Sequence, residues 1–222
     1  MNLYNEILKR FTGDDFREWM QKPFLIGDHA YATDAHVMVI VPKDRVTGIN
    51  ELERGDPEFV LKVIPAERNM NSDVPVEVLK AAIEKAPLVD EMKETKTECK
   101  ECDGAGEVEW DYGKWTKEFD CPVCYGEGST YTKIPSGNKI LSNDGYMKIG
   151  NSYFRVKMIS DIVKVAELLE ESEIRFIYQK ESNNANMIQI KDVEMLLSRC
   201  YAAAIEEGVK EGEDTLVTTI NL

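Results

Sequence analysis

The chain contains two cysteine- and glycine-rich segments, each of the form Cys-x-x-Cys-x-Gly-x-Gly, which limit its possible folds more than any other part of the sequence. The first runs from Cys99 to Gly106 and the second from Cys121 to Gly128, and eighteen residues separate the two cysteine pairs. Cysteines two residues apart can wrap a tight turn around one ion, while the glycines allow the positive φ angles that aim backbone N–H groups at thiolate sulfur. This spacing is typical of a four-cysteine metal site.

The sequence therefore predicts one structural zinc ion, bound by the four cysteines Cys99, Cys102, Cys121 and Cys124. Four thiolates leave no coordination position for water, so we expect the metal to be structural rather than catalytic. A dithiol redox pair and an iron–sulfur site compete with this interpretation, but the doubled glycine pattern has a reason only in the zinc case. Between the pairs, apolar residues flank residues 111–114, which predicts a hairpin that brings the second segment back to the first.

The number of cysteines and the length of the apolar runs indicate the cellular compartment of the protein. Five cysteines, four of them in close pairs, make an awkward disulfide framework, whereas a reducing compartment favours metal ligation. Cys200 stands in an apolar stretch and is predicted to be a buried, inert thiol. Because no apolar run approaches the length of a bilayer span, we predict a soluble, cytoplasmic protein with no membrane partner.

Outside the cysteine segments, the hydrophobic pattern predicts short strands and three helices. The predicted helices are 3–12, capped by Asn2, then 76–86, introduced by Asp73 and Pro75, and 159–170, starting at Ser160 or Asp161. A short helical turn is expected near residues 16–20. The predicted strands are 24–26, 30–33, 37–41, 59–64, two runs within 146–156, 174–178, 187–190 and 215–220. Residues 193–204 fit either a helix or a strand.

These elements divide the chain into a split domain with an insert. Residues 1–96 are expected to form the first half of the domain, residues 97–130 the inserted zinc finger, and residues 131–222 the second half. Polar stems at 87–97 and 129–136 should carry the insert away from one sheet.

The cysteine segments resemble the cysteine-rich zinc domain of DnaJ-type co-chaperones, which repeats the Cys-x-x-Cys-x-Gly-x-Gly unit four times and binds two zinc ions. This chain has two units, enough for one ion, and it lacks the His-Pro-Asp triplet of the J domain. The resemblance covers about thirty residues and implies a zinc-stabilised protein-interaction hairpin rather than a co-chaperone.

The segment Ala32-Thr33-Asp34, followed by Ala35 and His36, resembles the strand-turn motif of bacterial β sliding clamps. The order of helices and strands is similar as well. The resemblance implies an α+β fold: a clamp-like domain of antiparallel sheets and two or more helices, with the zinc-binding β-hairpin inserted. A clamp subunit has two or three such domains, whereas this chain has material for one.

Charge limits the role that a clamp-like domain can have here. The formal net charge is −14, and acidic residues outnumber basic ones in residues 1–95, 96–133 and 134–222 alike. Because such a chain repels phosphates, we expect DNA to be bound only through self-assembly, as a homo-oligomer, or through a partner. A contiguous basic face built from helix lysines would favour DNA, and its absence would favour protein partners; the candidates are Lys80, Lys85, Lys157 and Lys164.

A catalytic role has weaker support. His29 and His36 lie near Asp28 and Asp34, and on a strand Asp34 and His36 would face the same way, as an acid–base or metal pair does. No nucleophile signature or phosphate-binding loop accompanies them, so a hydrolase remains a third hypothesis. The sequence favours a non-enzymatic binding protein, an accessory of DNA replication or repair with a protein partner. The alternative is a zinc-dependent protein–protein adaptor without a nucleic-acid role.

Overall fold

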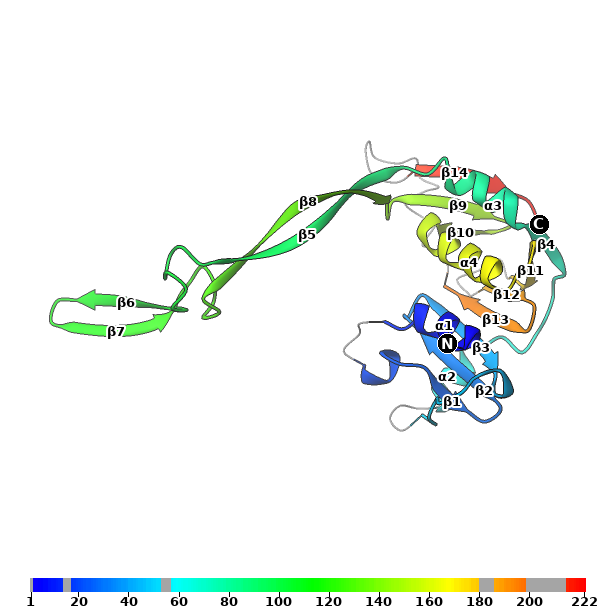
Figure 1. Ribbon diagram of the computed structural model, residues 1–222, viewed down its shortest axis with the longest axis horizontal. Coiled ribbons are helices and arrows are strands. Elements are labelled where there is room, and N and C mark those ends of the chain that lie inside the picture. The colour runs from blue at the N-terminus through cyan, green and yellow to red at the C-terminus, as the bar shows by residue number, and fades with distance from the viewer. Residues whose placement is uncertain (1, 14–16, 53–56, 180–185, 199–214) are drawn as a thin grey trace. The chain divides into compact units, whose positions relative to one another are not determined.

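The computed structural model describes residues 2–13, 17–52, 57–179, 186–198 and 215–222. The chain divides into two compact units (Figure 1). Unit 1 consists of Met1–Pro87 and Leu141–Leu222, and unit 2 is Leu88–Ile140. Unit 2 therefore contains the cysteine segments together with long flanking strands. Cys200, predicted to be a buried thiol, lies outside the described residues.

Unit 1 contains the helices of the described chain. They are α1 (Leu3–Arg10), α2 (Pro57–Lys62), α3 (Val76–Ile83) and α4 (Val156–Leu168), with the short 3-10 helices η1 (Glu18–Met20) and η2 (Lys43–Arg45). Its strands are β1 (Phe24–Ile26), β2 (His29–Thr33), β3 (Val37–Pro42), β4 (Ser72–Pro75), β9 (Gly145–Ile149), β10 (Ser152–Arg155), β11 (Glu173–Tyr178), β12 (Asn186–Ile190), β13 (Val193–Leu197) and β14 (Thr215–Ile220).

The strands of unit 1 form two sheets. A seven-stranded sheet has the order β1-β2-β3-β13-β12-β11-β4, and all its neighbours are antiparallel. A three-stranded sheet has the order β10-β9-β14, in which β10 is antiparallel to β9 and β14 is parallel to it. The α+β class and the predominance of antiparallel pairing, both predicted from the sequence, are confirmed.

Both faces of the seven-stranded sheet are buried, because its strands alternate between two hydrophobic clusters. On β3, Val37, Val39 and Val41 join the main core, which also contains residues of α1, α3, α4 and the three-stranded sheet. Met38 and Ile40 point to the other face and join a smaller cluster. Full burial of an aliphatic side chain contributes about 1.5–3 kcal/mol, so this run of five is a main source of stability for the sheet.

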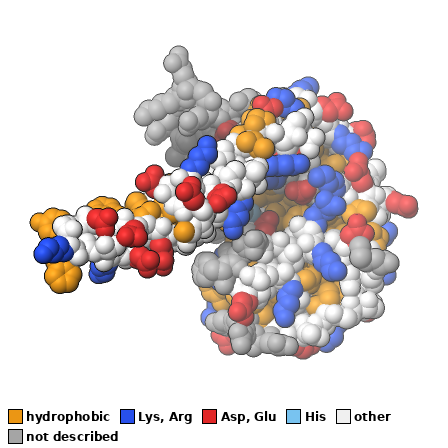
Figure 2. Space-filling view, turned by 60° about the vertical axis from the view of Figure 1, so that its left-hand side comes forward, with side chains coloured by type: hydrophobic (Ala, Val, Ile, Leu, Met, Phe, Trp, Pro, Cys, Tyr) orange, Lys and Arg blue, Asp and Glu red, His pale blue; other side chains and the backbone are white. Residues whose placement is uncertain are grey.

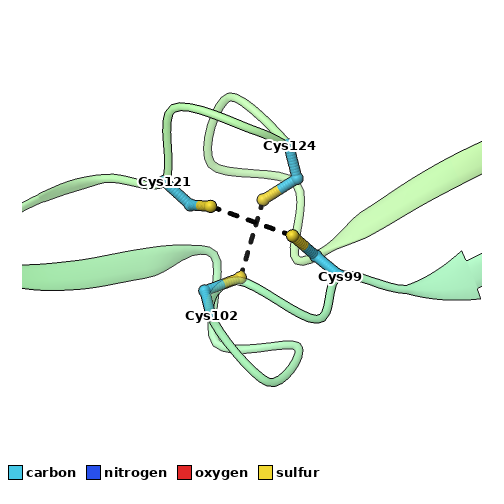
Figure 3. A group of neighbouring side chains, drawn as sticks. All are labelled: Cys99, Cys102, Cys121 and Cys124. Carbon is cyan, nitrogen blue, oxygen red and sulfur yellow. Dashed lines mark hydrogen bonds between the residues drawn. The ribbon is translucent and has the colours of Figure 1, made fainter.

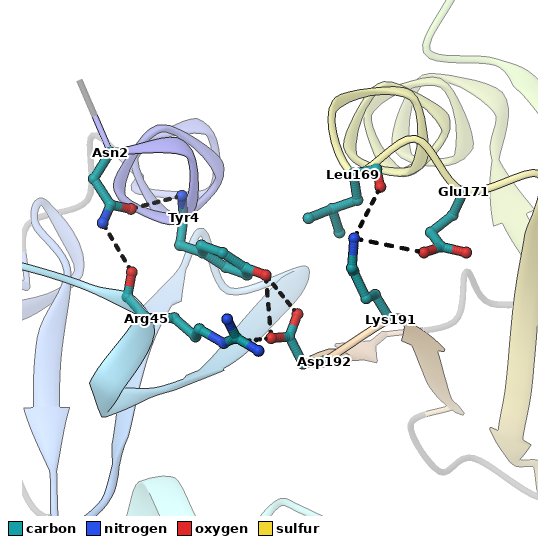
Figure 4. A network of polar contacts seen from close by, with 7 residues as sticks. All are labelled: Asn2, Tyr4, Arg45, Leu169, Glu171, Lys191 and Asp192. Atoms are coloured by element: carbon teal, nitrogen blue, oxygen red, sulfur yellow. Dashed lines mark hydrogen bonds and ion pairs between the residues drawn. The ribbon is translucent and has the colours of Figure 1, made fainter.

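The N-terminal helix is capped as the sequence predicts and is tied to a distant turn (Figure 4). The side-chain oxygen of Asn2 accepts hydrogen bonds from the backbone N–H groups of Tyr4 (2.9 Å) and Asn5 (3.2 Å). The Tyr4 hydroxyl donates to Asp192 Oδ1 at 2.8 Å, and Arg45 Nε lies 2.7 Å from Asp192 Oδ2. Burial, and then the hydrogen bond to Asp192, raise the pKa of Tyr4.

The neighbouring residue of the same turn contacts the end of α4. Lys191 Nζ lies 3.5 Å from the carbonyl oxygen of Leu169 and 3.9 Å from Glu171 Oε1 (Figure 4). A cation beside the last carbonyls of a helix is favourable. The two-residue turn between β12 and β13 therefore links α1 to the C-terminal end of α4.

The strand predicted at residues 59–64 is wrong, because this segment forms the helix α2. Phe59, Leu61 and Val63 are exposed, and Val60 is buried against the smaller cluster. Pro57, the first residue of the helix, suits that position because it lacks an N–H group to satisfy.

The predicted start of the second helix is confirmed, because α3 begins at Val76 with Pro75 as its N-cap residue, although it ends at Ile83 rather than at residue 86. Asp73 and Pro75 also belong to β4, an edge strand that was not predicted from the sequence. Asp73 faces Arg175 on β11, with Arg175 Nε 2.8 Å from Asp73 Oδ1. Asp73 therefore makes a cross-strand ion pair, and α3 has no side-chain cap.

The predicted start of α4 is wrong, and the segment that begins at residue 193 is a strand rather than a helix. The helix begins at Val156, directly after β10, with no side-chain cap from Ser160 or Asp161. Val156 is fully buried, so packing rather than capping fixes the start. Val193–Leu197 is a strand, and residues 199–204 lie outside the described chain. The last predicted strand is confirmed as β14.

Unit 2 consists of two antiparallel ribbons joined at the cysteines. Its strands are β5 (Leu88–Glu98), β6 (Glu107–Tyr112), β7 (Trp115–Asp120) and β8 (Ser129–Leu141). β5 pairs with β8 and β6 pairs with β7 (Figure 1). The β5–β8 ribbon is largely exposed and carries polar cross-strand contacts, such as Lys139 Nζ to Asp90 Oδ1 at 2.7 Å.

Candidate metal centre

The four cysteines of unit 2 converge on one point, although they come from segments on either side of the β6–β7 hairpin (Figure 3). All four Sγ atoms lie within 4.8 Å of one another, and all four residues are buried. Two close approaches join sulfur atoms of opposite segments: Cys99 Sγ to Cys121 Sγ at 3.8 Å and Cys102 Sγ to Cys124 Sγ at 3.7 Å. Sulfur atoms this far apart are not disulfide-bonded.

The sulfur spacing fits a tetrahedral metal ion. With a metal–sulfur bond of about 2.3 Å, the edge of a regular tetrahedron is about 3.8 Å, which matches the two approaches. Because those approaches link different segments, the cluster is unlike a redox pair formed within one Cys-x-x-Cys turn. Four thiolates in this arrangement suit a structural ion without an open position.

Backbone N–H groups complete the surroundings of the sulfurs. Gly106 N–H donates to Cys102 Sγ at 3.2 Å, and Gly128 N–H donates to Cys124 Sγ at 3.3 Å. Such hydrogen bonds stabilise the thiolate form that a metal requires. The symmetry follows from the repeated sequence, since each donor is the last glycine of its segment.

The same glycines allow the two segments to touch. Gly106 has φ +80° and its α-carbon faces the carbonyl of Gly126; Gly128 has φ +67° and faces the carbonyl of Gly104. A β-carbon at either position would lie too close to that carbonyl. The last glycine of each segment therefore has two roles: it donates to sulfur and it permits close backbone packing.

The pKa values of two of the cysteine thiols are shifted in opposite directions. Burial raises the pKa of Cys102 to about 12, although the Gly106 N–H opposes this effect. At Cys121 burial also acts to raise the pKa, but the N–H groups of Cys124 and Val123 outweigh it and lower the pKa to about 7. A metal must displace the remaining protons, so its affinity falls as the pH falls.

The two residues proposed for hydrolysis are Asp34 and His36, and the side chain of Asp34 has a structural role instead. Both residues lie in the turn between β2 and β3, not on a strand as the pairing hypothesis requires. Asp34 Oδ1 accepts the backbone N–H groups of His36 (2.9 Å) and Val37 (2.7 Å). The Thr33 hydroxyl accepts the N–H of Ala35, whose φ is +71°. The Ala-Thr-Asp motif thus builds a tight turn by side-chain capping.

The helix lysines do not form a purely basic face. Lys80 lies 2.8 Å from Glu167 and 3.1 Å from Glu77, and Lys164 lies 3.0 Å from Asp161. These hydrogen bonds raise the pKa of Lys80. Lys85, in the turn after α3, and Lys157, on α4, are exposed, and the helices α3 and α4 are in contact. Acidic partners offset the charge that phosphate binding would need.

The β6–β7 hairpin of unit 2 also has an exposed aromatic surface that was not predicted from the sequence. Exposed fractions are 63% for Trp110, 86% for Tyr112 and 78% for Trp115. The signal was the strict alternation of acidic and apolar residues along 107–112. Together with the pairing register of β6 and β7, this alternation places the aromatic side chains of the hairpin on one face.

Solved structures similar to this chain are bacterial DNA sliding clamps, at low sequence identity. A clamp from Bartonella birtlesii bound to griselimycin is 11% identical, with a TM-score of 0.49, and the match covers 90% of this chain and 64% of that one. A Pseudomonas aeruginosa clamp with ligand is 13% identical, with a TM-score of 0.47 and the same coverages. A Bacillus subtilis clamp is 14% identical, with a TM-score of 0.45, over 90% and 62% of the two chains.

This chain thus spans less than two-thirds of the length of these clamps. No family model and no curated protein matches the sequence. Among the described helices, none has the length and apolar character needed to cross a membrane.

Proposed function

We propose that this chain is a non-enzymatic binding protein whose unit 2 is held in shape by one structural zinc ion. Cys99, Cys102, Cys121 and Cys124 would hold the ion. The observation that carries this proposal is the tetrahedral spacing of four buried sulfurs, with backbone N–H groups donated to two of them. A closed thiolate set offers no position for a substrate, so the ion organises a surface rather than a reaction.

The role we propose for the whole chain is that of an accessory in DNA replication or repair, built on a clamp-like domain. Its support is the resemblance at Ala32-Thr33-Asp34, which ends β2 and begins the turn after it, together with the α+β arrangement around it. Because Lys80 and Lys164 are paired with carboxylates and the net charge is −14, DNA contact would require self-assembly or a partner.

The second candidate is a zinc-dependent adaptor that binds proteins and no nucleic acid. The offset charges of α3 and α4 favour it, and so does the exposed aromatic surface of unit 2. Both candidates share the zinc-held unit 2 and differ in whether the assembled protein ever meets DNA.

Sedimentation analysis combined with duplex DNA binding separates these candidates. At physiological salt we expect the monomer to show no dissociation constant below about 1 μM for duplex DNA. Binding that appears only with self-assembly would support the clamp-like role. Salt-sensitive, submicromolar DNA binding by a demonstrated monomer would contradict that expectation. If no assembly state binds DNA, the result would support the adaptor role.

A further inference from the structure

The β6–β7 hairpin has two faces of opposite character. Its register pairs Val108 with Phe119, Trp110 with Lys117 and Tyr112 with Trp115, and these six side chains share one side. We call its apolar members, Val108, Trp110, Tyr112, Trp115 and Phe119, the aromatic face. The other side carries the acidic face, defined as Glu107, Glu109, Asp111, Glu118 and Asp120.

The aromatic face is organised but not covered by the rest of the described chain. The rings of Trp110 and Phe119 meet edge to face with centroids 6.1 Å apart, and Lys117 Nζ lies 4.9 Å from the Phe119 centroid. Phe119 is nevertheless 47% exposed, and Trp110 and Trp115 are more so. Figure 2 shows hydrophobic side chains at the end of unit 2, with acidic side chains close by. Several large aromatic rings left in water in one place indicate a surface that binds.

The acidic face is electrostatically unfavourable in the chain alone. Glu107 lies directly opposite Asp120, and Glu109 lies directly opposite Glu118. Like charges in directly opposed positions destabilise a strand pair. Basic residues brought to this face from outside would relieve the repulsion, whereas phosphates would increase it.

The outer edge of β6 offers a place where both faces can be reached at once. A hollow of about 540 Å³ runs beside it, lined by Glu107 and Glu109 of the acidic face and Val108 and Trp110 of the aromatic face. Glu101 and Asp103 add further negative charge to its lining. Among the described strands, β6 pairs with β7 alone, so its second edge is available for backbone hydrogen bonds.

We propose that the outer edge of β6 binds an extended polypeptide strand in which apolar and basic residues alternate. Successive side chains of an added strand point to opposite faces, so its apolar residues would extend the aromatic face and its basic residues would meet the acidic face. The occupant is a protein segment rather than a nucleic acid, because four carboxylates, those of Glu101, Asp103, Glu107 and Glu109, line the hollow and would repel phosphates. This inference rests on the proposed function, since zinc holds the hairpin in place.

A set of synthetic peptides tests the proposal with the full chain, after its zinc content has been measured. The main probe is a nine-residue peptide of alternating lysine and valine. The controls replace lysine by glutamate, replace valine by serine, or methylate the backbone nitrogens, and an oligo(dT) strand tests nucleic acid. We expect the lysine–valine peptide to shift tryptophan emission to shorter wavelength and to bind at least about tenfold more tightly than every control.

Matched variants locate the site. Trp110→Ser should weaken binding of the lysine–valine peptide by about tenfold or more, because it removes a large apolar contact at the hollow. Tyr131→Ser changes an aromatic residue of similar exposure on β8 and should leave the affinity within about twofold. Unchanged zinc content in both variants confirms that unit 2 is folded.

Several results would overturn the inference. Equal binding of the serine or glutamate peptide would remove the need for apolar or basic residues, and equal binding of the methylated peptide would exclude strand addition. Tighter binding of oligo(dT) would make the surface a nucleic-acid site. If the zinc-loaded chain does not bind the lysine–valine peptide, this inference is refuted and the proposed function is not. If the chain binds no zinc, the proposed function is refuted.

Discussion

At the scale of single residues, the metal centre depends on glycine as much as on cysteine. Gly106 and Gly128 donate to sulfur, adopt positive φ, and sit against the carbonyls of Gly126 and Gly104. The sequence pattern predicted the positive φ angles, because glycine occurs two and four residues after the second cysteine of each segment and is the residue that adopts positive φ most readily. It did not predict the close approach of the two segments, since contacts between distant backbones leave no local signal.

Gly106→Ala tests this role, with Gly113→Ala as its control. Both glycines have positive φ, but a β-carbon at Gly106 meets a carbonyl while one at Gly113 meets open space. Gly113→Ala should destabilise the hairpin turn by about 1–2 kcal/mol, because alanine is strained in the left-handed conformation, and should have no further effect. Gly106→Ala should lower zinc affinity by more than about tenfold in a chelator competition assay. Equal affinities in the two variants would show that the close packing is unimportant.

At the scale of elements, prediction succeeded where one face or one run of residues was buried against a sheet. Residues 24–26, 37–41 and 174–178 were recognised as strands for that reason, and α1 was recognised from its cap. The prediction failed for α2, because its apolar residues are mostly exposed. Its apolar run therefore does not mark a buried strand. The prediction also missed β4, because Asp73 and Pro75 are common helix-start residues and only pairing with β11 reveals a strand.

The ion pair between β4 and β11 predicts a pH dependence of stability. The hydrogen bond from Arg175 lowers the pKa of Asp73 below its ordinary value. Asp73 therefore contributes stability above its unfolded-state pKa of about 3.9, and this contribution is lost as the pH falls through the lower folded-state pKa. Asp73→Asn should unfold at lower urea concentration than wild type at pH 7.

The difference in urea midpoint between Asp73→Asn and wild type should shrink as the pH approaches 3. The pair is exposed to solvent, so the effect should be small and should weaken at high salt. Asp90→Asn provides a control in unit 2, where the partner is Lys139 and the strand pair lies outside the main core. An Asp73→Asn difference that is unchanged or larger at low pH would contradict the assigned role of the ion pair.

At the scale of the whole molecule, unit 2 is an insertion whose two ends meet. The N–H of Ser142 donates to the carbonyl of Pro87 at 2.9 Å, so the chain leaves and re-enters unit 1 at neighbouring positions. The sequence placed an insert here because the cysteine segments interrupt a pattern of helices and strands. The sequence predicted polar stems at 87–97 and 129–136, and these segments form the exposed strands β5 and β8, of which β8 extends to Leu141.

Replacing residues 88–140 by a short glycine-rich link should therefore leave unit 1 folded. Closing a loop between adjacent ends has a low entropic cost, which changes by only about 0.6 kcal/mol for each doubling of loop length. Trp19 packs against Phe24 in unit 1 and becomes the remaining tryptophan, so its fluorescence reports urea unfolding directly. One cooperative transition is expected, and a loss of cooperativity would show that unit 1 needs unit 2 to fold.

Elemental analysis of the purified chain tests whether the four cysteines of unit 2 bind zinc. We predict one zinc ion per chain, lost in Cys102→Ser because a thiolate ligand is removed, and retained in Cys200→Ser because that cysteine belongs to neither segment. Chelation should unfold residues 97–130 while unit 1 keeps its structure. Iron in place of zinc, two ions per chain, or a Cys102→Ser protein that still holds its zinc would contradict the account.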